Sequence, residues 1–474
     1  MARRLVGIDL GVATAHTVVV LDEQSTVVAR RRCRPCRDSL EAIEAAALAG
    51  APPGTRLEVI FEPTGAAWLP VAVFFTRRGH AVHRVSSAKA SDLRRFLSRH
   101  AKSNAIDAET LARLPLIDPS GLSMVELAEG DHASLDRRVR AADRLRDRAA
   151  AHKTRLRDLA RQAMPMLEDA LGGSVLGVSD VAVLERYGDP RRMLRAGKTR
   201  LAALIAKTSR GHHGAARAER WLGVARHALE LYSDDPAVAF EDLAAEMATE
   251  ARLLRATEAE HARHAAVREQ AYLRIDPNQL ARSLPGIATT GGPVLVSVMG
   301  RPGRFPNADA FKAFTGLTPR ASQTGASDRK GQAMTKAGPR RLRDQLVQSA
   351  NSARRVDPQL AAVYWSQMVE RGAHHNKAVC VVAARLAARA WTVMARGEPY
   401  VLRDVDGRPV DAAQAKRIIA ERYTVTEHVR RRRRSRQTGK APQAMQHAPL
   451  NRGDLPTPNS RPNQTDTSRA PIPA

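Results

Sequence analysis

Two acidic residues near the N-terminus each end a short apolar run. Asp9 ends the run 5–9 and is followed closely by a glycine, and Glu62 ends the run 57–62 before Pro-Thr-Gly. Apolar runs of this length, bounded by turn-forming residues, predict buried strands. Carboxylates at neighbouring strand ends supply the oxygen ligands that Mg²⁺ or Mn²⁺ prefers. We therefore expect Asp9 and Glu62 to bind a divalent cation.

A third contribution is expected from the segment 102–109, Lys-Ser-Asn-Ala-Ile-Asp-Ala-Glu. On a helix, Asn104 and Asp107 are three residues apart and share a face, so both could point at Asp9. Two divalent ions held by such a set can activate an attacking oxygen and stabilise a leaving oxygen in phosphoryl transfer. The alternative is that each acid is an ordinary solvated surface residue.

The charge of the chain indicates its partner. Its 474 residues contain 76 Lys and Arg against 49 Asp and Glu, a net charge of +27. This excess is typical of a protein that covers the phosphates of double-stranded DNA or RNA. The alternative is a basic surface that serves only solubility. Aromatic residues make up 4% of the chain, which argues against a single-strand binder built on stacking platforms.

Cysteine usage and hydropathy exclude other classes of protein. Three cysteines do not form a disulfide scaffold in a chain of this size, and the pair Cys33 and Cys36 lacks a second pair to complete a zinc site. No apolar run reaches the roughly 18 residues of a membrane span, and no signal-peptide core precedes the first strand. We expect a cytoplasmic, nucleoid-associated protein with no membrane partner.

Residues 1 to about 115 alternate between strand and helix patterns. Strands are predicted over 5–9, 17–21, 26–31, 57–62 and 81–85, and helices over 39–49, 66–78, 87–99 and 104–114. Three successive strands followed by helix-strand units are the order of an α/β fold of the ribonuclease-H-like type. Residues 1–130 are therefore predicted to form a metal-binding catalytic domain.

The pattern becomes helical after this domain. Apolar residues recur at three- and four-residue steps over 134–164, which predicts a long amphipathic helix coiled against a second one over 237–275. We assign 131–276 to a coiled-coil spacer or dimerisation region, giving a homodimer or tetramer. The alternative is an ordinary helical hairpin.

The C-terminal part is predicted to be mainly α and then unstructured. Helices are expected over 289–299, 309–315, 338–353, 358–371 and 377–394, within a domain spanning 277–400. Residues 401–474 are predicted to be a basic, largely disordered tail, because a run of arginines from Arg430 to Arg434 is followed by seven prolines and little apolar surface.

Several motifs in this order resemble the DEDD transposases of the insertion-sequence-110 family, relatives of the Piv DNA invertase. The N-terminal motifs are Gly-Ile-Asp-Leu-Gly at 7–11, Glu-Pro-Thr-Gly at 62–65 and Lys-Ser-Asn-Ala-Ile-Asp-Ala at 102–108. The C-terminal motifs are Leu-Pro-Gly-Ile at 284–287, Gly-Leu-Thr-Pro-Arg at 316–320, Gln-Thr-Gly at 323–325 and Thr-Lys-Ala-Gly at 335–338. The resemblance covers residues 1 to about 400.

The resemblance implies roles for particular residues. It implies that Asp9, Glu62 and Asp107 are metal-binding acids of a RuvC-like domain, and it expects Asp where this chain has Asn104. An amide oxygen can still bind a cation but brings no charge, so a second ion would be held more weakly.

The resemblance also implies a hydroxyl nucleophile in the C-terminal domain. The family places a serine before a glycine where this chain has Thr324, with Ser322 as the second candidate. A hydroxyl needs a base or a metal to activate it. The alternative is a polar loop whose hydroxyls only bond to the backbone.

Cations surround this loop and are expected to bind nucleic acid: Arg320, Arg329, Lys330, Lys336, Arg340, Arg341 and Arg343. The alternative is a solvated basic face. The resemblance further implies a structured guide RNA, the bridge RNA, that pairs with target and donor DNA.

Together these features predict a DNA transposase or site-specific recombinase of a bacterial mobile element. The rival functions are a Holliday-junction or other structure-specific nuclease that uses only the N-terminal acids, a kinase or ATPase of the actin-like fold, and a catalytically decayed nucleic-acid-binding protein. The actin-like fold is disfavoured because no second Asp-x-Gly strand end with a glycine-rich nucleotide loop follows.

Overall fold

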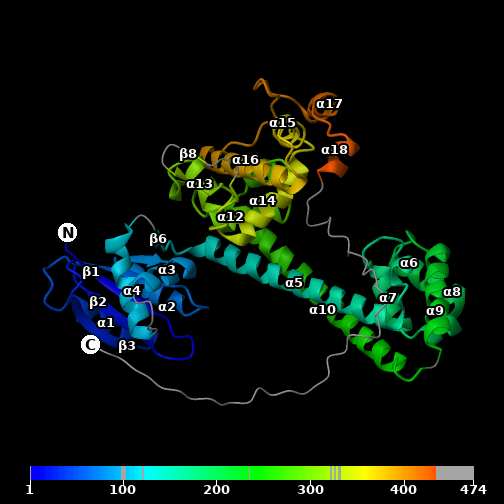
Figure 1. Ribbon diagram of the computed structural model, residues 1–474, viewed down its shortest axis with the longest axis horizontal. Coiled ribbons are helices and arrows are strands. Elements are labelled where there is room, and N and C mark those ends of the chain that lie inside the picture. The colour runs from blue at the N-terminus through cyan, green and yellow to red at the C-terminus, as the bar shows by residue number, and fades with distance from the viewer. Residues whose placement is uncertain are drawn as a thin grey trace, which may run out of the picture. The chain divides into compact units, whose positions relative to one another are not determined.

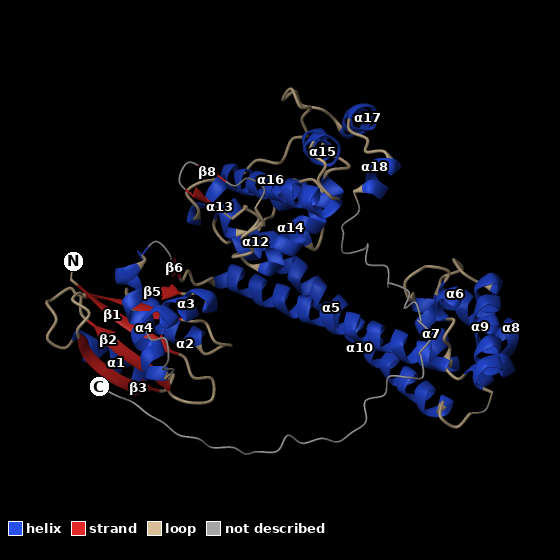
Figure 2. Ribbon diagram, viewed as in Figure 1, coloured by secondary structure: helices blue, strands red, loops and turns tan. Residues whose placement is uncertain are grey.

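The computed structural model describes residues 2–97, 103–119, 122–233, 235–320, 323–324, 327–328 and 332–433. The chain divides into two compact units. Unit 1 comprises Met1–Pro277 with Val296–Gly300, and unit 2 comprises Asn278–Leu295 with Arg301–Ala474. Unit 1 contains a sheet followed by long helices, and unit 2 is almost entirely helical (Figures 1 and 2).

A mixed sheet forms the N-terminal part of unit 1. Its strands are β1 (Arg3–Asp9), β2 (His16–Leu21), β3 (Val27–Cys33), β4 (Arg56–Phe61), β5 (Ala81–Arg84) and β6 (Ser123–Met124), in the order β3-β2-β1-β4-β5-β6. β1 pairs with β2 antiparallel and with β4 parallel, so it lies in the middle of the sheet. The predicted N-terminal sheet is confirmed, and its five predicted strands are all present. β6 was not predicted, because two residues carry no period that a sequence pattern could show.

Helices cover both faces of this sheet. They are α1 (Arg37–Leu48), α2 (Trp68–Arg77), α3 (Ser87–Leu97) and α4 (Asn104–Ile117). Alternate residues of β1 point to opposite faces, as expected for a strand buried on both sides. Val6 and Ile8 pack in a core with α1 and α2, whereas Leu5 packs with Ala108 and Ala112 of α4.

Gly7 brings α4 into direct contact with the backbone of β1. A Cβ atom at this position would lie 1.9 Å from the carbonyl oxygen of Ala108 and 2.4 Å from the amide nitrogen of Ala112. Both neighbours are backbone atoms of a helix, so neither can move away cheaply. The approach of α4 to the central strand therefore requires glycine at position 7.

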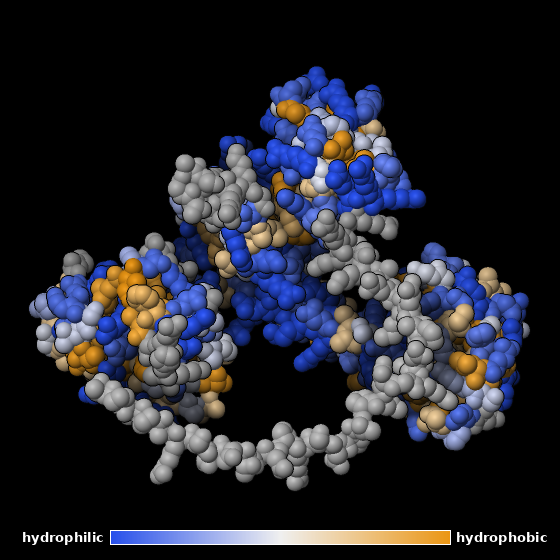
Figure 3. All heavy atoms as spheres, viewed as in Figure 1, coloured by the Kyte–Doolittle hydropathy of each residue, from blue (hydrophilic) through white to orange (hydrophobic). Residues whose placement is uncertain are grey.

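Two long helices make up the next part of unit 1. α5 (Gly130–Ala163) and α10 (Phe240–Ile275) pack against each other, and their ion pairs show that they run antiparallel. Arg274 pairs with Asp131 at 2.8 Å, and Arg155 pairs with Glu246 at 2.9 Å. The two predicted long helices are thus present, and their coiling stays a prediction. Over the middle of α5 the visible surface is mostly hydrophilic (Figure 3).

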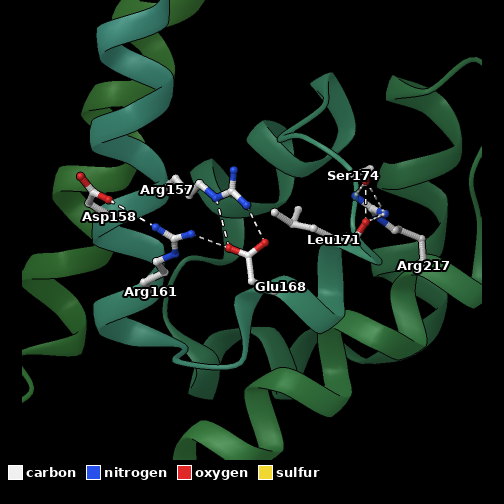
Figure 4. A network of polar contacts seen from close by, with 7 residues as sticks. All are labelled: Arg157, Asp158, Arg161, Glu168, Leu171, Ser174 and Arg217. Atoms are coloured by element: carbon white, nitrogen blue, oxygen red, sulfur yellow. Dashed lines mark hydrogen bonds and ion pairs between the residues drawn. The ribbon is translucent and has the colours of Figure 1, made fainter. Parts of the chain in front are cut away.

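Four shorter helices lie between them in the chain: α6 (Leu167–Leu171), α7 (Val178–Tyr187), α8 (Pro190–Thr208) and α9 (Ala215–Tyr232). Their core contains a buried ion pair, in which Arg217 lies 2.6 Å from Asp180, and the indole of Trp221 donates to the same carboxylate. Arg217 also donates to the carbonyl oxygen of Leu171 at 2.8 Å (Figure 4). Since this network satisfies the buried charges, it specifies how α6, α7 and α9 pack.

Unit 2 is built around one apolar helix. Its elements are α11 (Leu280–Ser283), the first half of α12 (Gly291–Met299), η2 (Pro302–Arg304), α13 (Ala308–Phe314), β7 (Gln323–Thr324), β8 (Ser327–Asp328), α14 (Arg340–Ala353), α15 (Pro358–Trp365), the π-helix η3 (Ser366–Glu370), α16 (His375–Arg396), α17 (Ala412–Arg422) and α18 (Glu427–Arg432). α16 packs against α13, α14 and α15, with Leu386 and Ala387 fully buried. Within the described residues, α16 is the one helix whose length and hydropathy would allow it to span a membrane. Its burial in unit 2 identifies it as a core helix.

The tail predicted from residue 401 is partly folded, and the prediction is wrong for residues 401–433. This segment forms α17 and α18, and Ala415 and Val425 are buried in it. Asp411 and Gln414 form a capping box that begins α17. The high charge of the segment concealed the few apolar residues that anchor it. Residues 434–474 lie outside the described residues.

The contact at Gly7 predicts a large effect of one methyl group. Gly7→Ala should lower the free energy of unfolding by roughly 1–3 kcal/mol or more, because the helix backbone must shift to admit the Cβ atom. Urea unfolding followed by circular dichroism measures this change. Gly223→Ala is the matched control. Gly223 lies within α9, and a Cβ atom added there would meet nothing within 4 Å. It should stabilise the protein by about 0.5–1 kcal/mol. Equal effects of the two substitutions would contradict the role given to Gly7.

Candidate active site

Asp9 and Glu62 lie side by side at one end of the sheet. The parallel register pairs Ile8 with Phe61; Asp9 is the last residue of β1, and Glu62 directly follows β4. Adjacent strands lie about 4.8 Å apart, so the register places both carboxylates at one edge. Both side chains are half-buried. The sequence prediction that these two acids lie at neighbouring strand ends therefore agrees with the topology.

Asn104 and Asp107 lie in the first turn of α4, the helix that packs on β1. Ser103 caps this helix, because its hydroxyl accepts a hydrogen bond from the amide of Ile106 at 3.2 Å. Asn104 is exposed and Asp107 is half-buried. A carboxylate in the first turn of a helix is stabilised by the helix dipole.

Asp107 already has a cationic partner. Its Oδ1 atom accepts a hydrogen bond of 3.1 Å from Nη1 of Arg94 on α3. Within the described parts of the chain, no three His, Cys, Asp or Glu side chains come close enough together to hold a metal ion. The structure thus brings the four predicted ligands to neighbouring elements, with Asp107 turned to an arginine.

His16 is a residue beside this site that the sequence prediction did not identify. It begins β2, is 1% exposed, and its Nδ1 atom accepts a hydrogen bond of 3.1 Å from the amide of Gly11. Burial lowers the pKa of His16, which favours the neutral ring that this hydrogen bond requires. Its Nε2 atom has no hydrogen-bond partner among the described residues. His16 therefore fixes the loop that follows Asp9. Only its position, at the start of an apolar strand, could have marked it.

The pair Cys33 and Cys36 lies in two different environments. Burial raises the pKa of Cys33 to about 11, and its thiol lies 3.1 Å from the carbonyl oxygen of Arg34. Cys36 is exposed, and its hydrogen bond with Ser39 lowers its pKa. Since a thiolate is the form that binds metals, Cys33 is a poor ligand at neutral pH.

Thr324 lies on a short β-hairpin of unit 2. β7 pairs antiparallel with β8, and the register pairs Thr324 with Ser327. The segments that enter and leave the hairpin are also joined, because the amide of Arg320 donates to the carbonyl oxygen of Ala333 at 2.9 Å. Thr324 thus belongs to the last described residue pair of the hairpin. The side chains of residues 321–331, and Ser322 altogether, lie outside the described residues.

The predicted nucleic-acid-binding cations fall into distinct groups. Arg320, Lys336 and Arg340 are exposed, and Arg340 forms an ion pair with Asp344 on the same helix. Arg341 is half-buried. Arg329 and Lys330 lie outside the described residues.

Arg343 is turned to the protein itself. Its Nη1 atom donates to the carbonyl oxygens of Lys336 and Gly338 at 3.2 and 3.1 Å. These bonds hold the chain that returns from the hairpin against the start of α14. The structure therefore gives Arg343 a positioning role at the base of the hairpin.

Comparisons with known proteins agree with both halves of this arrangement. A transposase family model matches residues 6–165, which include the acids of the sheet domain, and the model of the IS116/IS110/IS902 transposase family matches residues 278–365, which include the hairpin. The insertion element IS110 uncharacterized 43.6 kDa protein of Streptomyces coelicolor is 25% identical over 354 residues, or 73% of this chain and 84% of the relative. The chain belongs to the IS110 family of transposases, and it is a DNA-recombining enzyme.

Proposed function

We propose that this transposase cuts and rejoins DNA with a RuvC-like, Mg²⁺- or Mn²⁺-binding site formed by Asp9, Glu62, Asn104 and Asp107. The observation that carries the proposal is the parallel pairing of β1 with β4, which makes Asp9 and Glu62 neighbours at one edge of the sheet. The contact between Gly7 and α4 supports it, because this contact keeps the helix that bears Asn104 and Asp107 on the same strand.

The chemistry of this donor set suits a hard divalent cation. Three carboxylates and one amide supply only oxygen atoms, which Mg²⁺ and Mn²⁺ prefer. Bound there, the ion would activate the attacking oxygen and neutralise the leaving one. The strand register orients Asp9 and Glu62, and the ion pair with Arg94 is the contact that Asp107 must exchange for the cation.

We further propose that the hydroxyl of Thr324 is the nucleophile, with Ser322 as the alternative. Its oxygen attacks a DNA phosphorus, so a bond forms between this oxygen and phosphorus while the bond to one strand end breaks. The departing strand oxygen takes up a proton, and the threonine proton passes to a base or to solvent. Reversal of the step with a different strand end rejoins the DNA. The hairpin suits this role because Thr324 belongs to its last described residue pair, away from the segments joined at Arg320 and Ala333.

The partners proposed are double-stranded DNA and a structured guide RNA, in the cytoplasm at the nucleoid. The net charge of +27 and the exposed cations Arg320, Lys336 and Arg340 support a polyanionic partner. We propose that the antiparallel helices α5 and α10 take part in forming a homodimer or tetramer. A structure-specific nuclease that uses only the acids of the sheet domain is the second candidate, because Asp9 and Glu62 are already neighbours there without unit 2.

Removing the charge of Asp9 should abolish catalysis without unfolding the protein. Asp9→Asn is expected to eliminate Mg²⁺-dependent DNA cleavage, because an amide cannot neutralise a divalent cation, while DNA affinity and Tm stay nearly unchanged. Gel assays of strand cleavage, with anisotropy for binding, measure both properties. Asp92→Asn is the control, since Asp92 is exposed on α3 and pairs with Arg95. Full cleavage by Asp9→Asn would exclude the assignment.

Releasing Asp107 should strengthen cation binding. Arg94→Gln removes the competing guanidinium, and an ion pair of this exposure is worth up to about 1 kcal/mol, so the Kd for Mn²⁺ should fall by up to about fivefold. Isothermal titration calorimetry without DNA measures this affinity. The control is Arg95→Gln, one residue away, whose partner is Asp92. An unchanged or weaker affinity in Arg94→Gln would show that Arg94 does not compete with the cation.

A covalent mechanism predicts a protein–DNA adduct that survives denaturation on a nicked, trapped substrate. The adduct should map to the peptide with Thr324, be absent in Thr324→Ala and persist in Thr324→Ser, whose hydroxyl is less crowded. Mass spectrometry of the digested adduct gives the position. Loss in Ser322→Ala with retention in Thr324→Ala would identify Ser322 instead. Intact cleavage with no adduct in any variant would favour the nuclease.

A further inference from the structure

Unit 2 contains a basic cavity that belongs neither to the hairpin nor to the sheet domain. Its volume is about 230 Å³, and it lies where the end of α14 faces α15, α17 and α18. The polar lining includes four cations, Arg354, Arg355, Lys416 and Arg430, and two tyrosines, Tyr364 and Tyr423. Figure 1 shows α17 and α18 beside α15.

The cations of this cavity have no acidic partner among the described residues. No Asp or Glu lines the cavity, and none of the four cations forms an ion pair with a described carboxylate. The side-chain partner of Arg354 is the neutral Asn351, whose Oδ1 atom accepts from Nε at 3.0 Å. Like charges gathered around a half-enclosed space repel one another, so the cavity favours an anion.

Arg354 shows this imbalance most clearly. Its guanidinium is half-buried and lies 4.1 Å from the ring centroid of Tyr364, which is itself 3% exposed. Burial lowers the pKa of Arg354, and the neighbouring Arg355 and Arg430 lower it further. The same two effects, burial and nearby arginines, lower the pKa of His375 behind Tyr364. An anion in the cavity would stabilise the charged forms of Arg354 and His375.

The walls of the cavity are fixed by specific contacts. α18 is attached to the turn before α16, because Arg433 donates to the carbonyl oxygen of Gly372 at 3.0 Å and accepts, through its own carbonyl, from the amide of His375 at 3.3 Å. The hydroxyl of Tyr364 lies 2.8 Å from Nδ1 of His375. Val425 is buried between α17 and α18. These contacts hold α18, and with it the backbone of Arg430, at the wall of the cavity.

Tyr423 adds a surface for a planar group. Its ring is half-exposed, lines the cavity, and meets Trp365 edge to face at a centroid distance of 6.4 Å. Every nucleic-acid base has a flat face, so any base can stack on an aromatic ring of this kind, whatever the nucleotide sequence. The phosphates of a duplex lie on a convex surface, whereas a strand with an unstacked base can place both phosphate and base in a small cavity.

We propose that this cavity binds one phosphodiester of a single-stranded nucleic acid segment, with the adjoining base on Tyr423. Arg354 and Arg430 face the phosphate, and Arg355 and Lys416 extend the positive surface at the rim. The site would hold a strand that has been separated from its duplex. The proposal rests on the nucleic-acid chemistry of the family and is independent of the metal site, so a failure at Asp9 does not affect it.

A charge-matched pair of double variants of the full chain tests the proposal. Lys416→Gln with Arg430→Gln removes two charges from the cavity, and Arg417→Gln with Arg431→Gln removes two charges from the same helices outside it. Arg431 pairs with Glu427, and neither control residue lines the cavity. Fluorescence anisotropy measures binding of a short labelled oligothymidylate and of the matching oligouridylate over a series of salt concentrations, after thermal unfolding has shown that both variants fold.

The cavity variant should lower the slope of log K against log salt by about 0.7 more than the control does, which is the value for one phosphate of a single strand. Tyr423→Leu should weaken binding roughly tenfold with no change in slope, because it removes stacking but no charge. A preference for either oligonucleotide identifies the source of the strand and supports the proposal.

Three results would overturn it. Equal slopes for the two double variants would mean that only general charge matters. Unchanged binding by Tyr423→Leu would exclude the base contact. Binding of inorganic phosphate that is lost in the cavity variant, with oligonucleotide binding unaffected, would mean that the cavity holds a free anion.

Discussion

The close contact between Gly7 and the backbone of α4 is the constraint on which the N-terminal domain depends. A strand buried under a helix normally keeps side chains between them, but here carbonyl and amide groups of α4 meet a Cα atom. This contact fixes α4 along β1, and β1 in turn carries Asp9 and fixes the register of β4. The positions of the acids thus follow from one missing methyl group and one strand pairing. Their side-chain orientations depend on neighbours such as Arg94 and His16.

Unit 2 uses the same device where its motifs contain glycine. A Cβ atom on Gly338 would lie 1.8 Å from the carbonyl oxygen of Phe314, and one on Gly286 would lie 2.2 Å from that of Ser349. Gly286 also has a φ of +75°, a conformation that favours glycine. Gly338 lets the chain returning from the hairpin cross the end of α13, and Arg343 donates a hydrogen bond to the carbonyl oxygen of this glycine. Gly286 lets its turn meet the backbone of α14 near the end of that helix. The family motifs therefore include residues, such as Gly286 and Gly338, that allow close packing of the backbone.

The sequence predicted what depends on local period and missed what depends on tertiary contacts. The first five strands, the two long helices and the shared edge of Asp9 and Glu62 followed from apolar runs and strand ends. The partner of Asp107 could not be predicted, because Arg94 is one of many arginines and its distance from the acid is a tertiary property. The sequence also predicted that Arg343 binds nucleic acid. Its hydrogen bonds to the carbonyl oxygens of Lys336 and Gly338 are tertiary contacts that no local pattern shows. The folded segment 401–433 was missed because so few of its residues, such as Ala415 and Val425, are apolar.

The pairing of Arg274 with Asp131 gives the long helices a topological property. α5 has 34 residues and α10 has 36, so each is about 50 Å long. Nevertheless, the end of α10 lies next to the start of α5, because Arg274 pairs with Asp131. Insertion or deletion of matched turns on both helices changes the reach of α6 to α9 and leaves the entry and exit points together. The region can thus vary in length during evolution without disturbing the strands that precede it. A continuous helix joining two domains would lack this freedom, because every added turn would displace one end from the other.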